Sequence, residues 1–352
     1  MASYIYSADM IGVAIGCVAV IFLINCFGTQ NALLLYSIII AILGLYLSKI
    51  MIKKCITNIL IFILTIVLFI LGLSPSSAIT EVSISTNPDK EIYDAINLFD
   101  GKIKETTYGA FGRIDLIQYP DHIGWMDIYL NGTAGMPMYK YSGVISDPNI
   151  NHLKKSFTGY FPFHTLSPEQ KKNALIIGPG GGRDILVAKL GGVENITAVE
   201  VNKDIVKLVK RYSNYNGNIY DDYEGVQIIV DEGRSFVKRQ KSTYDIIMLS
   251  LAVTNTNRSR EGLSLTENYL FTVESIGDYI AHLTEQGSLI VIAHDDVEIL
   301  RLLTTCLTVF EKCGLESEDA MKHFYILGSD TYPVFVLKKV PLTKKNPRYY
   351  TI

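Results

Sequence analysis

The stretch ALIIGPGGGRDILVAKLGG, residues 174–192, decides the fold of this chain. Its first four residues are a short apolar run, typical of a buried strand. Residues 178–182 are a glycine-rich turn, and residues 183–192 have the pattern of a helix that ends at glycine. A strand, a tight turn and a helix in this order predict the first half of a βαβ unit.

The same cycle of strand and helix repeats after this stretch. We expect strands at residues 196–200, 226–230, 244–249, 288–293, 324–328 and 334–339. We expect helices at residues 203–213, 234–240, 270–284 and 296–313. The alternation predicts an α/β domain with a Rossmann-like sheet of the class I methyltransferase type, parallel and covered on both faces. The last two strands are expected to be antiparallel at its edge.

A small β region precedes this domain. RIDLIQY (113–119) and WMDIYL (125–130) are rich in β-forming residues and flank a turn with Pro and Gly, which predicts a hairpin of a small antiparallel sheet. We therefore divide the chain into four parts. They are a three-helix transmembrane region (1–75), a linker (76–104), a small β-hairpin domain (105–165) and the Rossmann-like domain (166–345).

The N-terminal part accounts for much of the 49% hydrophobic content. Residues 10–27, 32–48 and 57–73 are nearly uncharged, and each is about as long as a bilayer core requires. We read them as three transmembrane helices, so that residues 10–73 make the chain a multi-pass membrane protein.

The orientation in the membrane has arguments on both sides. Lys49, Lys53 and Lys54 lie between the second and third segments, and the positive-inside rule would keep this loop in the cytoplasm and the large domain outside. Lysines near helix ends can also snorkel to a headgroup layer. The nucleoside inferred below is made in the cytoplasm, so we favour a cytoplasmic domain.

Candidate ligand-binding residues follow the first three strands of the domain. Ligands of doubly wound sheets bind beyond the carboxyl ends of the strands. Glycines at the turn, Gly178, Gly180, Gly181 and Gly182, allow close approach of the backbone to a ligand. Glu200 ends the second strand, where a carboxylate can accept both hydrogen bonds of a ribose diol, and Asp231 ends the third, where it can accept one from an adenine amino group. Together they predict a nucleoside site of the S-adenosylmethionine type.

At these residues the chain resembles the spermidine synthase (polyamine aminopropyltransferase) family, in particular its membrane-fused bacterial relatives. The resemblance covers residues 105–340 and rests on the glycine-rich stretch and on four further segments. These are IYLNGTAGMPMY (128–139), ITAVEVN (196–202), VDEGRSFV (230–237) and LSLTENYLFTVES (263–275). It implies an N-terminal β domain and a Rossmann-like transferase domain that moves an aminopropyl group from decarboxylated S-adenosylmethionine to an amine.

The departures from the family concern the chemistry. This chain has Gly181 at the position of the Asp in the family's GGGDGG motif. After the fourth strand the family has a DSSDP-like segment, and this chain has Ser250 and Val253 at the positions of its two Asp residues. An ammonium acceptor needs a base, because it has no lone pair with which to attack. As catalytic candidates we take Glu267, Ser250 and His294.

The expected donor site comprises residues at the ends of the first four strands. They are Gly178, Gly180, Gly181, Gly182, Arg183, Asp184, Glu200, Asp231, Glu232 and Ser250. Arg183 is also placed to pair with the carboxylate of intact S-adenosylmethionine. Two alternatives therefore stay open beside aminopropyl transfer, namely methyl transfer from the intact donor and a nucleoside-binding sensor without catalysis.

Other classes of function find no support in the sequence. The formal net charge of −3 gives no reason to expect nucleic acid as a partner. No spacing of His, Cys or carboxylate residues suggests a metal site. The expected partners are the nucleoside donor, an amine acceptor and the membrane, with a homodimer as one option for the assembly.

Overall fold

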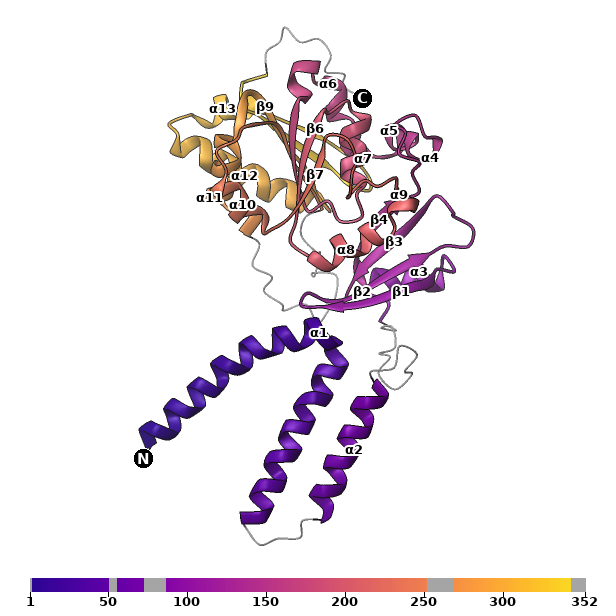
Figure 1. Cartoon of the computed structure of the whole chain (residues 1–352). Coiled ribbons are helices and arrows are strands. Elements are labelled where there is room, and N and C mark those ends of the chain that lie inside the picture. Colours follow the sequence, from indigo (N-terminus) through magenta and orange to yellow (C-terminus); the bar gives the residue numbers. More distant parts are fainter. Residues whose placement is uncertain (1, 51–55, 73–86, 252–268, 343–352) are drawn as a thin grey trace. The chain divides into compact units, whose positions relative to one another are not determined.

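The computed structural model describes residues 2–50, 56–72, 87–251 and 269–342 (Figure 1). The chain divides into two compact units. The first comprises Met1–Thr86, Thr106–Asp115 and Leu130–Gly132, and the second comprises Asn87–Glu105, Leu116–Tyr129 and Thr133–Ile352. Three strands, Lys102–Gly109, Gly112–Gln118 and Trp125–Leu130, therefore have residues in both units.

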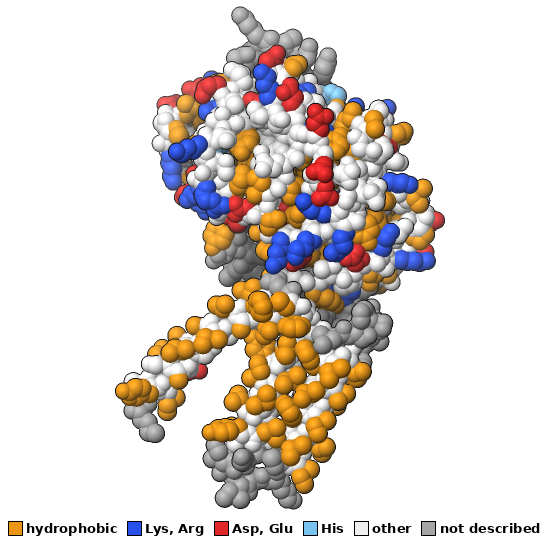
Figure 2. Space-filling view, in the orientation of Figure 1, with side chains coloured by type: hydrophobic (Ala, Val, Ile, Leu, Met, Phe, Trp, Pro, Cys, Tyr) orange, Lys and Arg blue, Asp and Glu red, His pale blue; other side chains and the backbone are white. Residues whose placement is uncertain are grey.

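The N-terminal unit contains the long apolar helices. Helix α1 (Ala2–Ile50) is interrupted at Gly28, whose φ of 78° lies outside the helical range, and α2 is Ile56–Gly72. The second half of α1 packs beside α2, where the Asn58 side chain donates to the Gly44 carbonyl at 3.3 Å. The rings of Phe27, just before the interruption, and Phe69 have centroids 6.1 Å apart. Figure 2 shows that hydrophobic side chains cover the visible surface of these helices.

Among the described residues, one helix is long and apolar enough to cross a membrane. It is Ser3–Ile24, with 22 residues and a mean hydropathy of 2.3. The other two expected segments form shorter apolar helices, Asn31–Leu47 and Ile56–Leu71. At about 1.5 Å per residue, a 17-residue helix such as α2 is about 26 Å long, slightly less than a bilayer core of about 30 Å. The structure thus supports one of the three expected spans by length and composition.

A four-stranded sheet follows, with the order β1-β2-β3-β4. Its strands are β1 (Lys102–Gly109), β2 (Gly112–Gln118), β3 (Trp125–Leu130) and β4 (Thr133–Tyr139). The expected hairpin is confirmed as β2 and β3. The outer strands were not anticipated, because one is rich in polar residues and the other contains Gly and Pro.

The expected linker at residues 76–104 is partly structured. Helix α3 (Glu91–Asn97) lies within it, and β1 begins before its end. Ile92 and Ala95 of this helix are buried, and the Gly135 N–H of β4 donates to Glu91. The helix was missed because seven residues are too few to show a convincing period.

Short helices connect the two sheets. They are α4 (Pro148–Asn151), α5 (Leu153–Ser156), α6 (Pro162–Thr165) and the 3-10 turns Thr158–Tyr160 and Pro168–Lys171.

The large sheet has seven strands in the order β10-β11-β9-β8-β5-β6-β7. The strands are β5 (Asn173–Ile177), β6 (Asn195–Glu200), β7 (Val226–Val230), β8 (Tyr244–Ser250), β9 (Leu283–Ile292), β10 (Phe324–Leu327) and β11 (Val334–Lys338). Strands β5 to β9 pair in parallel, and β10 and β11 are antiparallel at the edge. The predicted α/β fold is confirmed.

Helices cover both faces of this sheet. They are α7 (Arg183–Leu190), α8 (Lys203–Arg211), α9 (Ser213–Asn216), α10 (Gly233–Arg239), α11 (Val273–Ala281), α12 (Asp296–Lys312) and α13 (Ser317–Ala320). Side chains of α10, α11 and α12 join one core cluster with alternate residues of the strands, and Figure 1 shows α7 on the opposite side. Every residue of β8 is buried, as expected for a central parallel strand.

One boundary differs from the sequence expectation. The helix expected at 270–284 ends at Ala281, and β9 begins at Leu283, ahead of the expected start at residue 288. Leu283 pairs with Tyr244, and the register between β8 and β9 shifts before the pairing resumes at Ile246 and Ser288. This irregularity interrupts the residue pattern at the start of β9, so the sequence did not show that the strand begins at Leu283.

Strand β4 packs closely on the glycine-rich turn that links β5 to α7. A Cβ atom at Gly181 would lie 2.4 Å from the carbonyl oxygen of Pro137, and one at Gly180 would lie 2.9 Å from the sulfur of Met136. Real Cβ contacts do not become this short, so the backbone of β4 leaves room only for glycine at residue 181. The turn is glycine-rich partly for the packing of its own chain.

We predict that Gly181→Ala destabilises the protein, because the new methyl group meets a backbone carbonyl that cannot rotate away. Overpacking of this kind costs about 1–3 kcal/mol. Gly277→Ala in α11 is the matched control, since nothing lies within 4 Å of its Cβ position and alanine favours helix by about 1 kcal/mol. Denaturant unfolding of the detergent-purified chain, followed by circular dichroism, measures both. Equal midpoints for Gly181→Ala and the native protein would contradict the proposed clash.

Candidate functional site

The candidate site lies at the carboxyl ends of the parallel strands. The chain adds β6 and β7 on one side of β5, and then β8 and β9 on the other side. The order therefore reverses between β5 and β8, and crevices at such reversals are where doubly wound sheets bind ligands. The glycine turn follows β5 and Ser250 ends β8, so both flank this point.

The turn itself has an unusual backbone. Gly178, Gly180 and Gly182 have φ values of 72°, 54° and 97°, in the left-handed region that side chains disfavour. The Gly178 N–H donates to the Val199 carbonyl of β6 at 2.9 Å, and the Gly182 N–H donates to Pro179 at 2.8 Å. This conformation delivers the chain directly into α7.

Glu200 is buried against this turn, with 5% of its surface exposed. One carboxylate oxygen accepts a hydrogen bond from the Gly180 N–H at 3.2 Å, and the other accepts from the Asn202 N–H at 2.9 Å. Burial raises the pKa of Glu200, and the two backbone N–H groups partly oppose this rise. The Tyr220 hydroxyl donates to the Gly180 carbonyl at 2.7 Å. Glu200 thus holds the turn, and each of its oxygens keeps a second lone pair.

Arg183, Asp184 and Ser250 form a second buried group. The Arg183 guanidinium donates to Ser250 Oγ at 3.1 Å and to Asp184 Oδ1 at 3.4 Å, and it lies 4.2 Å from the ring centroid of Phe157. Asp184 is 3% exposed and Ser250 is 4% exposed. Burial raises the pKa of Asp184, while Arg183 and a hydrogen bond with Ser250 act against it. The structure therefore brings these three expected site residues into one network.

The residues after β7 have partners of their own. Asp231 accepts from the Glu232 N–H at 2.9 Å and forms an ion pair with Arg239. The Glu232 side chain caps α10 by accepting from the N–H groups of Arg234 and Ser235 at 3.0 and 2.7 Å. Burial pushes the pKa of Glu232 up, but these hydrogen bonds outweigh it and lower the pKa below its usual value. Glu232 therefore has a structural role that the sequence analysis did not assign.

Of the two remaining catalytic candidates, His294 and Glu267, the structure describes His294. His294 follows β9 at the same edge of the sheet, and its N–H donates to Glu298 at 2.8 Å. Glu267 lies outside the described residues. Val253, at the second acidic position of the family segment, lies outside them as well.

A cavity of about 350 Å³, which the sequence analysis missed, lies between α3 and the small sheet. Carboxylates and aromatic rings line most of it: Glu91, Asp94, Phe99, Tyr119, His122, Trp125, Asp127 and Tyr129. The Tyr119 hydroxyl donates to Asp127 at 2.8 Å and lies 3.3 Å from the hydroxyl of Tyr129. Such a lining suits an ammonium group, which carboxylates neutralise and aromatic faces attract.

Asp127 connects this cavity to the turn electrostatically. Burial raises the pKa of Asp127, while the hydrogen bonds from Tyr119 and Trp125 and the positive charge of Arg183 lower it.

Two features of the sequence could have indicated this cavity. Glu91 and Asp94 have the i, i+3 spacing of one helix face, and Asp127 interrupts an otherwise apolar strand.

Comparisons with known proteins agree with the sequence resemblance. Residues 154–313 match the spermine/spermidine synthase domain. A polyamine aminopropyltransferase of Buchnera aphidicola subsp. Acyrthosiphon pisum is 33% identical over 141 residues, which cover 39% of this chain and 44% of the relative. That of Buchnera aphidicola subsp. Schizaphis graminum is 38% identical over 150 residues, which cover 40% and 49%. The chain thus spans about half the length of the curated relatives it matches.

The solved structure of spermidine synthase from Thermotoga maritima is 19% identical, with a TM-score of 0.47 over 70% of this chain and 75% of that one. The domain match begins after the small sheet, and is therefore narrower than the resemblance over residues 105–340. It includes the glycine turn, Glu200, Asp231 and Ser250. Residues 154–313 of the chain are thus similar to the spermine/spermidine synthase domain.

Proposed function

We propose that this protein transfers an aminopropyl group from decarboxylated S-adenosylmethionine to an amine. The observation that carries the proposal is the acidic and aromatic cavity, whose buried Asp127 experiences the charge of Arg183 at the glycine turn. It supplies carboxylates for a cationic acceptor, and the glycine turn supplies a site suited to a nucleoside. The domain match and the curated relatives support the same reaction class.

In this proposal the donor binds at the carboxyl edge of the large sheet. The turn residues Gly178, Gly180, Gly181 and Gly182 approach it closely, Glu200 accepts from the ribose diol, and Asp231 accepts from the adenine amino group. Arg183, Asp184 and Ser250 line the reactive end of the donor.

The reaction itself needs alignment and one base. The amine nitrogen attacks the aminopropyl carbon next to the sulfonium, a C–N bond forms as the C–S bond breaks, and sulfur leaves as the neutral thioether of methylthioadenosine. The nitrogen must first give its proton to a base. Glu267, Ser250 and His294 remain the candidates, and Asp127 would hold the ammonium at the other end of the acceptor.

Methyl transfer from intact S-adenosylmethionine is the second candidate function. Arg183 favours it, because a guanidinium can pair with the carboxylate that only the intact donor has. In the structure Asp184 already pairs with Arg183 at 3.4 Å, which reduces the charge available for a ligand. We therefore rank methyl transfer second and a non-catalytic sensor third.

We predict that the detergent-purified protein forms methylthioadenosine only when it receives both the decarboxylated donor and a diamine such as putrescine. Mass spectrometry identifies the product. Asp127→Asn should raise the KM for the amine about 10- to 100-fold, because a hydrogen bond to a charged group contributes about 1.5–3 kcal/mol. The dissociation constant of the donor should stay the same.

Asp121→Asn is the control for this variant, since Asp121 lies in the same small β region, is exposed and does not line the cavity. Release of S-adenosylhomocysteine from the intact donor would support methyl transfer. Binding of donor without any product would support the sensor. Equal amine KM values for both variants would exclude the cavity as the acceptor site.

We predict that Glu200→Ala weakens binding of methylthioadenosine by about 1–3 kcal/mol, because it leaves the ribose hydroxyls and the Gly180 N–H without their acceptor. Calorimetric titration measures the change. Asp147→Ala, which removes the side-chain cap of α4, serves as the comparison. It should lower the stability by about 1 kcal/mol, the usual cost of losing a helix cap, and leave the affinity unchanged. An unchanged affinity in Glu200→Ala would contradict the proposed ribose contact.

We further propose that residues 10–73 hold the protein at a membrane, cross it more than once and leave the large domain in the cytoplasm. Support comes from the helix Ser3–Ile24 and from exposed apolar side chains such as Val18, Ile40 and Ile56. Among the described residues, nothing buries the apolar window of Ser3–Ile24, which is 0% buried, and so large an apolar surface marks a membrane or protein interaction site.

The full-length chain is accordingly predicted to stay in the membrane pellet after an alkaline carbonate wash, which strips proteins held only by charge. A peripheral membrane protein processed in the same tubes is the control. Release of the chain into the supernatant would contradict membrane insertion.

A further inference from the structure

A second cavity lies at the opposite, amino-terminal edge of the large sheet. It has a volume of about 770 Å³ and is lined by residues around the starts of β5, β8 and β9 and the end of β11. This volume is in the range of small-molecule sites, about 300–1,000 Å³. Nothing in the proposed transferase chemistry uses this edge of the sheet.

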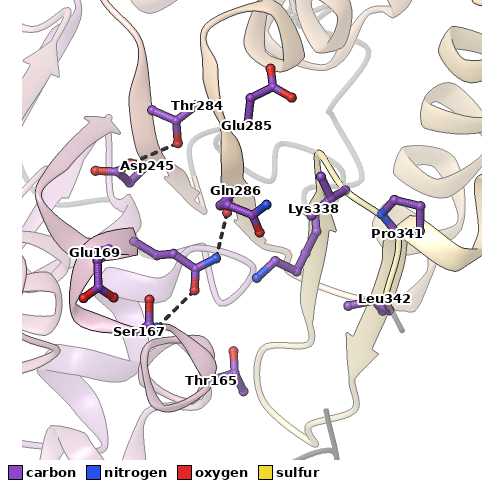
Figure 3. A pocket seen from close by; sticks show the side chains of 12 residues that line it. Thr165, Ser167, Glu169, Asp245, Thr284, Glu285, Gln286, Lys338, Pro341 and Leu342 are labelled. Carbon is purple, nitrogen blue, oxygen red and sulfur yellow. Dashed lines mark hydrogen bonds between the residues drawn. The ribbon is translucent and has the colours of Figure 1, made fainter. Parts of the chain in front are cut away.

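Among the described residues, Lys338 is the cation that lines this cavity. It is 8% exposed, and Figure 3 shows its side chain extending from the strand into the space surrounded by Thr165, Ser167 and Gln286. Within the described part of the chain, no carboxylate or hydrogen-bond acceptor pairs with its ammonium group. Burial alone lowers the pKa of Lys338.

The carboxylates of the cavity are engaged elsewhere. Asp245 accepts from the hydroxyl of Thr284 at 2.9 Å and from a backbone N–H of β5 at 3.0 Å. Glu285 forms an ion pair with Lys339 at 3.4 Å. Glu169 is exposed, and hydrogen bonds from its own backbone and from a neighbouring serine lower its pKa. The positive charge of Lys338 is therefore not neutralised by these acids.

A second unsatisfied group lies beside Lys338. Ser288 is its direct partner in the register of β11 and β9, so both side chains are on one face of the sheet. The Ser288 hydroxyl is fully buried and has no hydrogen-bond partner among the described residues. Ser288 does not itself line the cavity, so Lys338 is the group of this pair that a ligand there can reach. Burying a cation without a partner is costly, and an anionic ligand that accepts hydrogen bonds from Lys338 removes the cost.

We propose that this cavity binds a small molecule through an oxyanion, either a carboxylate or a phosphate. The Lys338 ammonium pairs with the anion, and the Gln286 amide, which also lines the cavity, contacts the rest of the ligand. The site is separate from the glycine turn, because it lies at the other end of the same strands. The proposal does not depend on the proposed transferase activity.

Titration calorimetry of the detergent-purified full chain with inorganic phosphate and with succinate tests this proposal. At least one of the two should bind, and Lys338→Met should weaken that binding at least tenfold. The anion with the lower dissociation constant, phosphate or succinate, identifies the chemical class of the ligand. Lys339→Met is the matched control, since Lys339 is the adjacent lysine and already pairs with Glu285, and it should change the affinity less than threefold.

A labelling experiment on the native chain covers the case in which Lys338→Met does not fold. The bound anion should slow acylation of Lys338 by an amine-reactive reagent, measured by peptide mass spectrometry, and leave the labelling of Lys322 unchanged. Absence of binding by both anions, equal binding by Lys338→Met, or unprotected Lys338 at saturating anion would each overturn the proposal.

Discussion

No side chain fits at Gly181, and the candidate site is built around this restriction. The carbonyl of Pro137 in β4 takes the space where a Cβ would be, so the small sheet and the glycine turn are in direct backbone contact. Two hydrogen bonds hold the same turn. The Glu200 carboxylate accepts from the Gly180 N–H, and the Tyr220 hydroxyl donates to the Gly180 carbonyl. Three different elements therefore fix one five-residue turn.

That fixed turn determines where the charged groups lie. It starts α7 at Arg183, and the guanidinium reaches Ser250 at the end of β8. Asp184 is buried beside both groups, and the charge of Arg183 extends to Asp127 on the small sheet. In the proposed reaction, the acidic groups that the family has at the positions of Gly181 and Ser250 are replaced by carboxylates from other elements. A binding site can keep its charge while its residues change position.

Both edges of the large sheet contain buried polar groups. At the carboxyl edge, the carboxylates of Glu200 and Asp184 have backbone or side-chain donors. At the amino edge, the carboxylates are satisfied, and the ammonium of Lys338 and the hydroxyl of Ser288 lack partners among the described residues. The imbalance at the second edge is of the kind that an anionic ligand would correct.

The sequence by itself determined the α/β fold, the seven strands of the large sheet, the β2–β3 hairpin and the glycine turn, because each depends on local periodicity and turn chemistry. It also assigned Arg183, Glu200 and Ser250 to one edge of the sheet, because parallel strands bring their carboxyl ends to the same edge. Only the tertiary structure decided the close approach of β4 to Gly181, the cap made by Glu232 and the cavity around Asp127. The same holds for the lack of a partner for Lys338 among the described residues. These features depend on contacts between segments far apart in the chain, such as Pro137 with Gly181 and Glu91 with Gly135, and no local pattern of residues encodes such distances.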